Sequence, residues 1–256
     1  MWEHDLASLA PLVLLFDQPL SEMKQKLRLL VDGSSDLAIE MASDPFSSSS
    51  KVQQGSIGFD IIWSDERPVL SGYRSVFFGT LPPGKSTLLL VKLSKDLAGG
   101  ERVAPIAKAL LVFGARIARQ LSAQAVMWTP AKIISDPAFF AENVENYAKG
   151  EIFPVLVTVD FDYQDEESKL ISTGLEWFAG QEIELGGAGL RGQDLVRRAV
   201  RLVHDICTNG AVDTHQRIPD LDADKLIELT PLPESNFLRC EILSKTDETI
   251  QVTSVH

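Results

Sequence analysis

One stretch of the sequence matches the phosphate-binding loop of nucleotide-dependent enzymes. Residues 79–86 satisfy the pattern G-x-x-x-x-G-K-[ST], with Gly84, Lys85 and Ser86 in the positions that would bind phosphate. Such a loop works because successive backbone N–H groups point at the phosphates, and the two prolines just before Gly84 carry no N–H group. The pattern therefore favours a turn that joins two strands, and a nucleotide-dependent enzyme is the alternative hypothesis.

A second glycine-rich stretch, residues 187–192, matches the dinucleotide-binding pattern G-x-G-x-x-G, and Asp213 follows it as that motif requires. In a dinucleotide-binding fold this acid ends a hydrophobic strand, whereas residues 211–216 are mostly polar. The preceding residues 182–185 alternate as a half-exposed antiparallel strand would. We therefore expect a connection from strand to helix here, and no cofactor.

Two further groups of side chains have types that could bind a metal or attack a substrate. His204 and Cys207 lie three residues apart, but apolar neighbours favour a buried cysteine beside a surface histidine. The acidic cluster that starts at Asp160 fails the calcium-loop pattern, because its sixth position is not glycine. No metal site is predicted, and a metal-assisted hydrolase that uses Asp160, Asp162 and Glu176 is a further alternative.

The composition limits the class of partner. Of 256 residues, 36 are acidic and 24 are basic, so the net charge is −12 with histidine neutral. Binding to nucleic acid or to an anionic membrane needs clustered Lys and Arg, and we expect neither. The apolar runs are far shorter than the ~20 residues of a membrane span. Because the start of the chain lacks the positive region of a secretory signal, we expect a cytoplasmic protein.

The hydrophobic pattern of the first half predicts the elements that position these residues. Two helices are indicated by apolar residues at helical spacing, one from Ser21 to Gly33 and a longer one over 103–121. The serine-rich residues 43–54 are predicted to form a polar loop. The predicted strands of this half are residues 12–16, 37–41, 57–63, 74–80, 87–93 and 124–128.

The second half continues this alternation of helices and strands. Helices are predicted from Pro137, which Asp136 caps, and over 194–208. The second of these helices has an apolar stripe that would face inward, and its arginines, including Arg198, would face solvent. The predicted strands of this half are residues 153–163, 170–178, 182–185, 212–218, 226–229, 237–243 and 249–255.

Together these elements predict an α+β protein in which antiparallel sheets carry helices on one face. The first half follows the order β-α-β-β-α-β with an extra strand, and the second half nearly repeats it before a terminal strand meander. We therefore expect two ferredoxin-like halves, residues 1–130 and 131–256.

Four tracts carry a resemblance to a known family. Residues 125–131 read AVMWTPA, residues 137–140 read PAFF, residues 173–178 read TGLEWF and residues 182–184 read EIE. In this order they resemble the bacterial family known as domain of unknown function 4261, over roughly residues 100–215. The resemblance implies a bacterial cytoplasmic protein with an α+β fold, and it implies no reaction, cofactor or catalytic residue.

Acidic and aromatic side chains within these tracts make up the predicted ligand-binding site. Trp128 ends a predicted strand, and Glu176, Glu182 and Glu184 lie on predicted strands, so that strand ends and acids would converge. The sequence offers no convincing nucleophile–base pair and no ligand cluster. It therefore predicts a non-enzymatic, adaptor-like protein whose partner is another protein.

Overall fold

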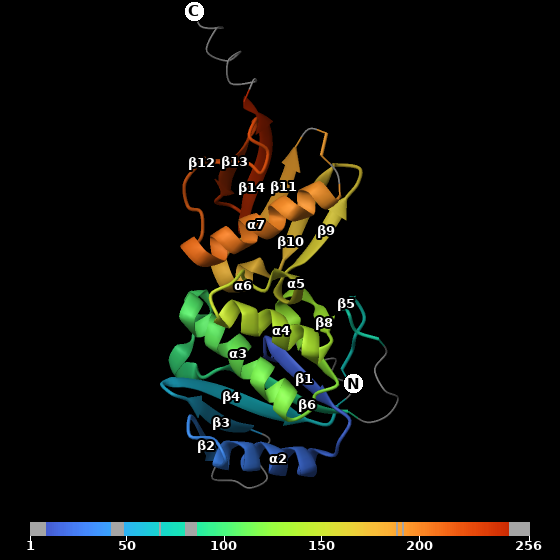
Figure 1. Ribbon diagram of the computed structural model, residues 1–256, viewed down its shortest axis with the longest axis vertical. Helices are drawn as coiled ribbons and strands as arrows, with labels where there is room; N and C mark the ends of the chain where they lie inside the picture. Colours follow the sequence, from blue (N-terminus) through green and yellow to red (C-terminus); the bar gives the residue numbers. More distant parts are fainter. Residues whose placement is uncertain are drawn as a thin grey trace, which may run out of the picture. The chain divides into compact units, whose positions relative to one another are not determined.

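The computed structural model describes residues 9–41, 49–66, 68–79, 86–187, 189–190 and 192–245. Its contacts divide the chain into an N-terminal unit that ends at Thr158 and a C-terminal unit that begins at Val159. Each unit is built on one mainly antiparallel sheet with helices, which confirms the α+β class (Figure 1). The boundary differs from the expected one after residue 130, because the strand before that residue pairs with the strand after it.

The sheet of the N-terminal unit has eight strands in the order β2-β3-β4-β6-β1-β7-β8-β5. Its neighbouring strands are antiparallel, except that β5 and β8 run parallel. The strands are β1 (Leu12–Phe16), β2 (Leu37–Met41), β3 (Ser49–Gln54), β4 (Ile57–Ser64), β5 (Arg74–Val76), β6 (Thr87–Leu93), β7 (Ala125–Trp128) and β8 (Ile133–Ser135). The helices are α2 (Leu20–Asp32), α3 (Ala104–Gln120), α4 (Pro137–Ala148) and α5 (Val155–Thr158).

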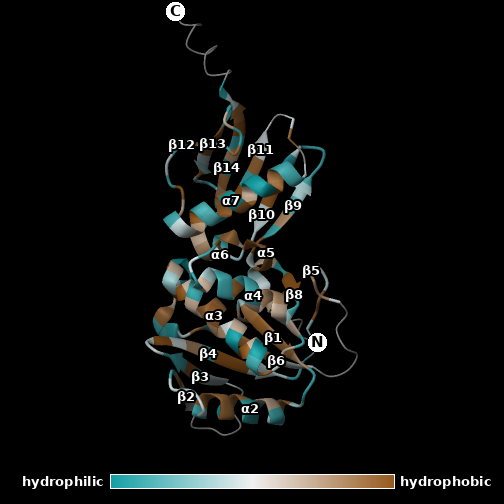
Figure 2. Ribbon diagram, in the orientation of Figure 1, coloured by the Kyte–Doolittle hydropathy of each residue, from teal (hydrophilic) through white to brown (hydrophobic). Residues whose placement is uncertain are grey.

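Apolar side chains on both faces of this sheet form the core. Helix α3 approaches β1 closely at Gly114, where a Cβ atom would lie 2.1 Å from Leu12 Cδ2. Beside this contact, the rings of Phe59 and Phe113 stack with their centroids 4.4 Å apart. Figure 2 shows the hydrophobic residues of β1 at the centre of the unit. The opposite face carries a second apolar cluster that includes Val13 and is partly covered by residues of the segment after β4.

One strand of this unit was predicted to be loop. Strand β3 lies within the serine-rich segment and pairs with both β2 and β4. Val52 is its one buried residue, and its other side chains are polar, so the hydrophobic pattern gives no signal for a strand. Residues 43–48 lie outside the described residues, as does Thr80 at the end of the predicted strand 74–80, of which the structure shows β5.

The sheet of the C-terminal unit has six strands in the order β12-β13-β14-β11-β10-β9. Two three-stranded antiparallel meanders meet at its centre, where β11 and β14 pair in parallel. The strands are β9 (Asp160–Gln164), β10 (Lys169–Thr173), β11 (Glu182–Gly187), β12 (Gln216–Pro219), β13 (Lys225–Leu232) and β14 (Phe237–Ser244). Helices α6 (Leu175–Ala179) and α7 (Gln193–Asn209) complete the unit.

The ferredoxin-like order is not confirmed in either unit. A ferredoxin-like unit is built from split β-α-β crossovers, whose two strands run parallel. In the N-terminal unit, β1 is instead antiparallel to both of its neighbours, β6 and β7. In the C-terminal unit the parallel neighbours β11 and β14 are separated in sequence by α7, β12 and β13.

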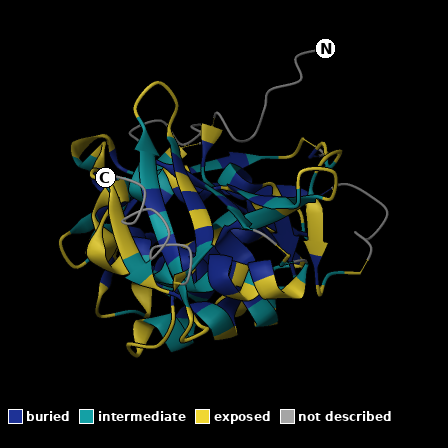
Figure 3. Cartoon of the chain, turned by 90° about the horizontal axis from the view of Figure 1, so that it is seen from above, coloured by how far each residue is buried: buried dark blue, intermediate teal, exposed yellow. Residues whose placement is uncertain are grey.

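One face of the C-terminal sheet is covered by α7, whose apolar stripe is buried as predicted. Burial therefore alternates along the strands: on β14, Leu238, Cys240 and Ile242 are buried, whereas Arg239 and Glu241 are exposed. The same banding of buried and exposed residues is visible on the strands in Figure 3. The face opposite α7 consequently carries the exposed charged residues of β14.

Two predicted strands extend too far. Residues 153–163 include α5 before β9 begins, because Pro154 is followed by a single helical turn. The strand predicted over 170–178 ends at Thr173, since Gly174 has φ 100°, a left-handed conformation that turns the chain into α6. The terminal strand predicted over 249–255 lies outside the described residues.

Arg198 of α7 was predicted to face solvent, but its side chain is only 4% exposed. Its guanidinium donates hydrogen bonds to both carboxylate oxygens of Asp220, from Nε at 2.8 Å and 3.0 Å and from Nη2 at 2.8 Å. Nη2 also donates to Asp222 at 2.7 Å. Arg198 can be buried because Asp220, 22 residues further along the chain, neutralises its charge. Helical periodicity alone does not indicate such a partner.

Candidate functional site

The four predicted site residues are divided between the two units. Trp128 belongs to the N-terminal unit, where it is 1% exposed and forms part of the core. Glu176, Glu182 and Glu184 belong to the C-terminal unit, and each of them has a different environment.

Glu182 is buried and serves the backbone of its own unit. Its Oε1 atom accepts hydrogen bonds from the N–H groups of Gly174 at 2.6 Å and Glu176 at 3.0 Å. Its Oε2 atom accepts from the Ser172 hydroxyl and from the Leu175 N–H. Burial raises the pKa of Glu182, and these hydrogen bonds oppose that shift. Both oxygens of the Glu182 carboxylate are therefore used by donors of the same chain. The carboxylate fixes the turn into α6 and is not free to bind a ligand.

The other two glutamates are more accessible. Glu176 is exposed and accepts a hydrogen bond of 2.8 Å from Asn236 Nδ2, in the turn before β14. Glu184 lies on the sheet face opposite α7, with Lys169 Nζ at 3.9 Å and Arg239 Nε at 4.0 Å. Of the three glutamates, Glu184 is therefore the one that lines a groove.

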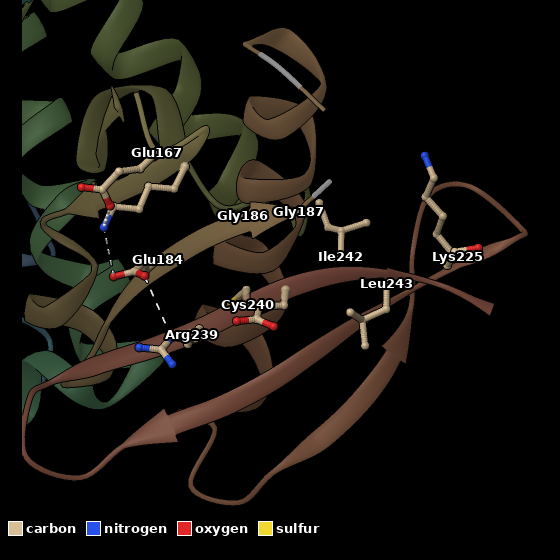
Figure 4. Close-up of a pocket in the computed structure, with 12 residues that line it drawn as sticks. Glu167, Glu184, Gly186, Gly187, Lys225, Arg239, Cys240, Ile242 and Leu243 are labelled. Atoms are coloured by element: carbon tan, nitrogen blue, oxygen red, sulfur yellow. Dashed lines mark ion pairs between the residues drawn. The ribbon is translucent and has the colours of Figure 1, made fainter. Parts of the chain in front are cut away.

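This groove, which we call the Glu241 groove, has a volume of about 400 Å³ and lies on the face opposite α7. It follows the parallel strands β11 and β14, and Figure 4 shows Glu184 and Arg239 facing each other across them. Its lining includes Glu167, Lys169, Glu184, Gly186, Gly187, Lys225, Arg239 and Glu241.

Two consecutive glycines shape the floor of the Glu241 groove. A Cβ atom at Gly187 would lie 2.7 Å from Ile242 Cβ, so the close packing of β11 against β14 requires glycine there (Figure 4). A Cβ at Gly186 would meet nothing nearer than Lys169 Cβ at 3.8 Å. A side chain at Gly186 would therefore make only ordinary contacts, so glycine is not a packing requirement there.

The cations of the groove are already held by acids. Lys169 forms an ion pair with Glu167, and this hydrogen bond raises the pKa of Lys169. Lys225 Nζ lies 2.9 Å from Asp222 Oδ2, and that hydrogen bond raises the pKa of Lys225. Together with Arg239 beside Glu184, these pairs neutralise the basic groups of the groove.

One carboxylate of the groove lacks such a partner. Glu241 is exposed and lies opposite Gly186 on one side and Glu228 on the other. Glu228 is itself paired with Arg217 Nη2 at 2.8 Å and His215 Nε2 at 3.2 Å. Among the residues that the structure describes, no cation pairs with Glu241. The groove, whose lining also includes the apolar residues Ile242 and Leu243, thus carries one carboxylate that no described cation neutralises.

The glycine-rich patterns occupy other places. Gly84 and Lys85 lie outside the described residues, and Ser86 leads directly into strand β6, whereas a phosphate-binding loop leads into a helix. Gly187 to Gly192 connects β11 to α7, as expected, and Asp213 is exposed in the turn after α7. The expectation of a half-exposed antiparallel strand over 182–185 is met on one side only, because β11 is antiparallel to β10 but parallel to β14.

The cysteines are shielded from reaction, and the acidic residues of the described chain form no metal-binding group. Burial raises the pKa of both Cys207 and Cys240, so the reactive thiolate form is disfavoured. Asp160 and Asp162 lie on β9, and Glu176 lies on α6. Within the described ranges, no group of three His, Cys, Asp or Glu side chains is placed to hold a metal ion.

Sequence reasoning missed Gly186, Arg239 and Glu241. The alternation along residues 237–244 does place Arg239 and Glu241 on one face of a strand. Nothing local indicates that this strand pairs with β11, which ends at Gly187, far earlier in the sequence than Phe237, where β14 begins. The groove between the two strands could therefore not be predicted.

Among the described residues, none of the helices combines the length and apolar character needed to traverse a bilayer. No family model, no curated protein and no solved structure matches this chain. The resemblance to the domain of unknown function 4261 family stays a prediction.

Proposed function

We propose that this chain is a non-enzymatic interaction protein whose C-terminal unit binds a basic segment of another protein in the Glu241 groove. The observation that carries the proposal is the Glu241 carboxylate. It is exposed opposite Gly186, which has no side chain to cover it, while each cation of the groove already has an acid beside it.

A lysine or arginine side chain of the partner supplies the charge that Glu241 lacks. An ammonium or guanidinium group placed above Gly186 would donate hydrogen bonds to the carboxylate, and charge-assisted bonds of this kind are the stronger ones. Because Gly186 has no side chain, nothing on β11 directly opposite Glu241 covers the carboxylate from that side.

The charge of the whole chain favours the same class of partner. A net charge of −12 attracts basic molecules at long range and increases the rate of their encounter. The ion pairs at Lys169, Lys225 and Arg239 would hold the surface around the partner in a fixed arrangement. Polar rims of this kind contribute to specificity more than to affinity.

The proposal is tested by fluorescence anisotropy with a labelled peptide of alternating lysine and serine. We expect the parent protein to bind at low salt, and Glu241→Gln to weaken binding roughly fivefold through loss of one ion pair. The matched control is Asp213→Asn, which removes an exposed acid of the same unit outside the groove. Absence of binding by the parent, or an equal loss in both variants, would contradict the proposal.

A further inference from the structure

A second cavity of the C-terminal unit lies between α7 and the edge of the sheet. We propose that this cavity, which we call the Arg201 pocket, binds a small amphipathic anion: an apolar ring or chain that ends in a carboxylate or sulfonate. Its volume is about 450 Å³, within the range of ~300–1,000 Å³ typical of small-molecule sites. Its lining comes from the second half of α7, the turn that follows it, β12 and β13.

The walls of the pocket are suited to an apolar body. Leu202 and Ile206 come from α7, and Val212, Ile218 and Leu229 come from the turn and the two strands. Leu202, Ile206 and Leu229 are buried beneath the cavity, and the half-buried Val212 and Ile218 therefore offer most of the apolar surface that these five residues expose to it. Each apolar group of a ligand that enters displaces water from this surface, which is favourable.

The wall formed by the turn is fixed in place. Gln181 is buried, and with its amide oriented to satisfy both groups, its nitrogen donates to Val212 O at 3.1 Å and its oxygen accepts from Val212 N at 3.3 Å. The turn itself starts at Gly210, whose N–H donates to Ile206 O at 2.9 Å. A cavity wall that is already ordered costs a ligand little conformational entropy on binding.

The polar end of the ligand is set by Arg201. Its Nε atom lies 3.6 Å from Asp205 Oδ2 one helical turn away, and no other acid pairs with Arg201 within the described residues. The two terminal nitrogens are therefore available, and a guanidinium binds carboxylate or sulfonate oxygens through parallel hydrogen bonds. Asp205 repels an anion, but it also orients the guanidinium along the helix.

The direction of the ligand follows from the helix. The carbonyl groups at the end of α7, near Asn209, give that end a partial negative charge. An anionic group is therefore disfavoured there and favoured two turns earlier, at Arg201. The apolar body consequently points toward Val212 and Gly210.

This inference is independent of the proposed function, because the Arg201 pocket shares no lining residue with the Glu241 groove. It is tested with two fluorescent probes of the same shape: 8-anilinonaphthalene-1-sulfonate, which carries a sulfonate, and N-phenyl-1-naphthylamine, which carries no charge. We expect the folded parent to bind one equivalent of each, with blue-shifted emission.

Three variants decide between the possible outcomes. Arg201→Gln should weaken binding of the sulfonate probe roughly tenfold and leave the neutral probe unchanged, because only the charge-assisted hydrogen bonds are lost. Val212→Asp, which places a charge in the apolar part, should abolish binding of both probes. Arg197→Gln, on the exposed side of α7, is the control and should change neither.

Melting curves measured by circular dichroism show that each variant is folded. The inference is overturned if the folded parent binds neither probe saturably, if binding survives Val212→Asp, or if Arg201→Gln and Arg197→Gln have the same effect on the sulfonate probe. Binding of the neutral probe alone would contradict the assignment of an anionic ligand.

Discussion

Glu241 on β14 lies directly opposite Gly186 on β11, across the parallel pair of strands at the centre of the C-terminal sheet. Gly186 has no side chain to cover the carboxylate, and the next strand on the other side offers another acid, Glu228. The pairing of these two strands therefore produces an open, negatively charged position that neither strand would form alone.

The two adjacent glycines of β11 should respond differently to the same substitution. Gly187→Ala should destabilise the fold by about 1–3 kcal/mol, because the new Cβ would overlap Ile242. Gly186→Ala should be neutral or stabilise by up to about 1 kcal/mol, since its Cβ meets only ordinary contacts and the unfolded chain loses freedom. Urea unfolding measures both, and equal free energies of unfolding would refute this account of the floor.

The Arg198–Asp220 pair should couple α7 to the loop before β13. Arg198→Met leaves the Asp220 carboxylate, which is 0% exposed, without its cation and should cost about 3–5 kcal/mol. Adding Asp220→Leu should recover part of that loss, because the uncompensated charge is then gone. The control is Arg197→Met on the exposed side of the helix, expected within about 0.5 kcal/mol of the parent. A small loss for Arg198→Met would show that the pair is not buried in solution.

Glu182 should make stability depend on pH. Burial raises the folded-state pKa of this carboxyl above its unfolded value, so the folded protein binds the proton more tightly than the unfolded chain does. The contribution of Glu182 to stability is therefore fully present below the unfolded pKa and is lost as the pH rises through the folded pKa. Relative to Glu182→Gln, the parent should lose stability from pH 4 upward.

Denaturant unfolding at a series of pH values measures the difference in unfolding free energy between the parent and Glu182→Gln. Any effect of the substitution that does not depend on pH leaves the slope of this difference against pH unchanged. Ser172→Ala should move the midpoint of the profile to higher pH, because the Ser172 hydrogen bond lowers the pKa of Glu182. A difference between parent and Glu182→Gln that is the same at every pH would disprove the raised pKa.

The two thiols should be inert in the folded protein. Burial raises the pKa of Cys207 and Cys240, so little thiolate forms at pH 8. With an aromatic disulfide reagent, we expect slow reaction in buffer and rapid reaction of both thiols in denaturant. Fast release of one equivalent from the native protein would contradict this and would identify an accessible, reactive cysteine.

The sequence predicts the strongly periodic elements well. Strand β1 and helices α3 and α7 are confirmed, because their apolar residues recur at the spacing of the structure they form. Strand β3 could not be found in this way, since a polar strand is held by its backbone pairing with two neighbours. Helix α6 was predicted as strand, because a short apolar run is compatible with a helix and with a strand. The left-handed conformation of Gly174 ends the strand and starts the helix.

The candidate site depended on long-range pairing and was largely beyond sequence reasoning. Glu184 was predicted as a site residue and does line the Glu241 groove. Glu182 instead accepts hydrogen bonds from backbone N–H groups, which the sequence pattern around it does not indicate. Gly186 and Glu241 become neighbours only through the parallel pairing of β11 with β14. Pairing between distant strands is set by the whole core and not by the residues of either strand.

The most direct measurement of the central claim is an amide NMR titration of the isotopically labelled protein with the lysine–serine peptide. The account predicts chemical-shift changes centred on Gly186, Arg239 and Glu241, which fade as salt is added and which need roughly fivefold more peptide in Glu241→Gln. Saturable shifts centred elsewhere, or unchanged spectra at low salt, would contradict it.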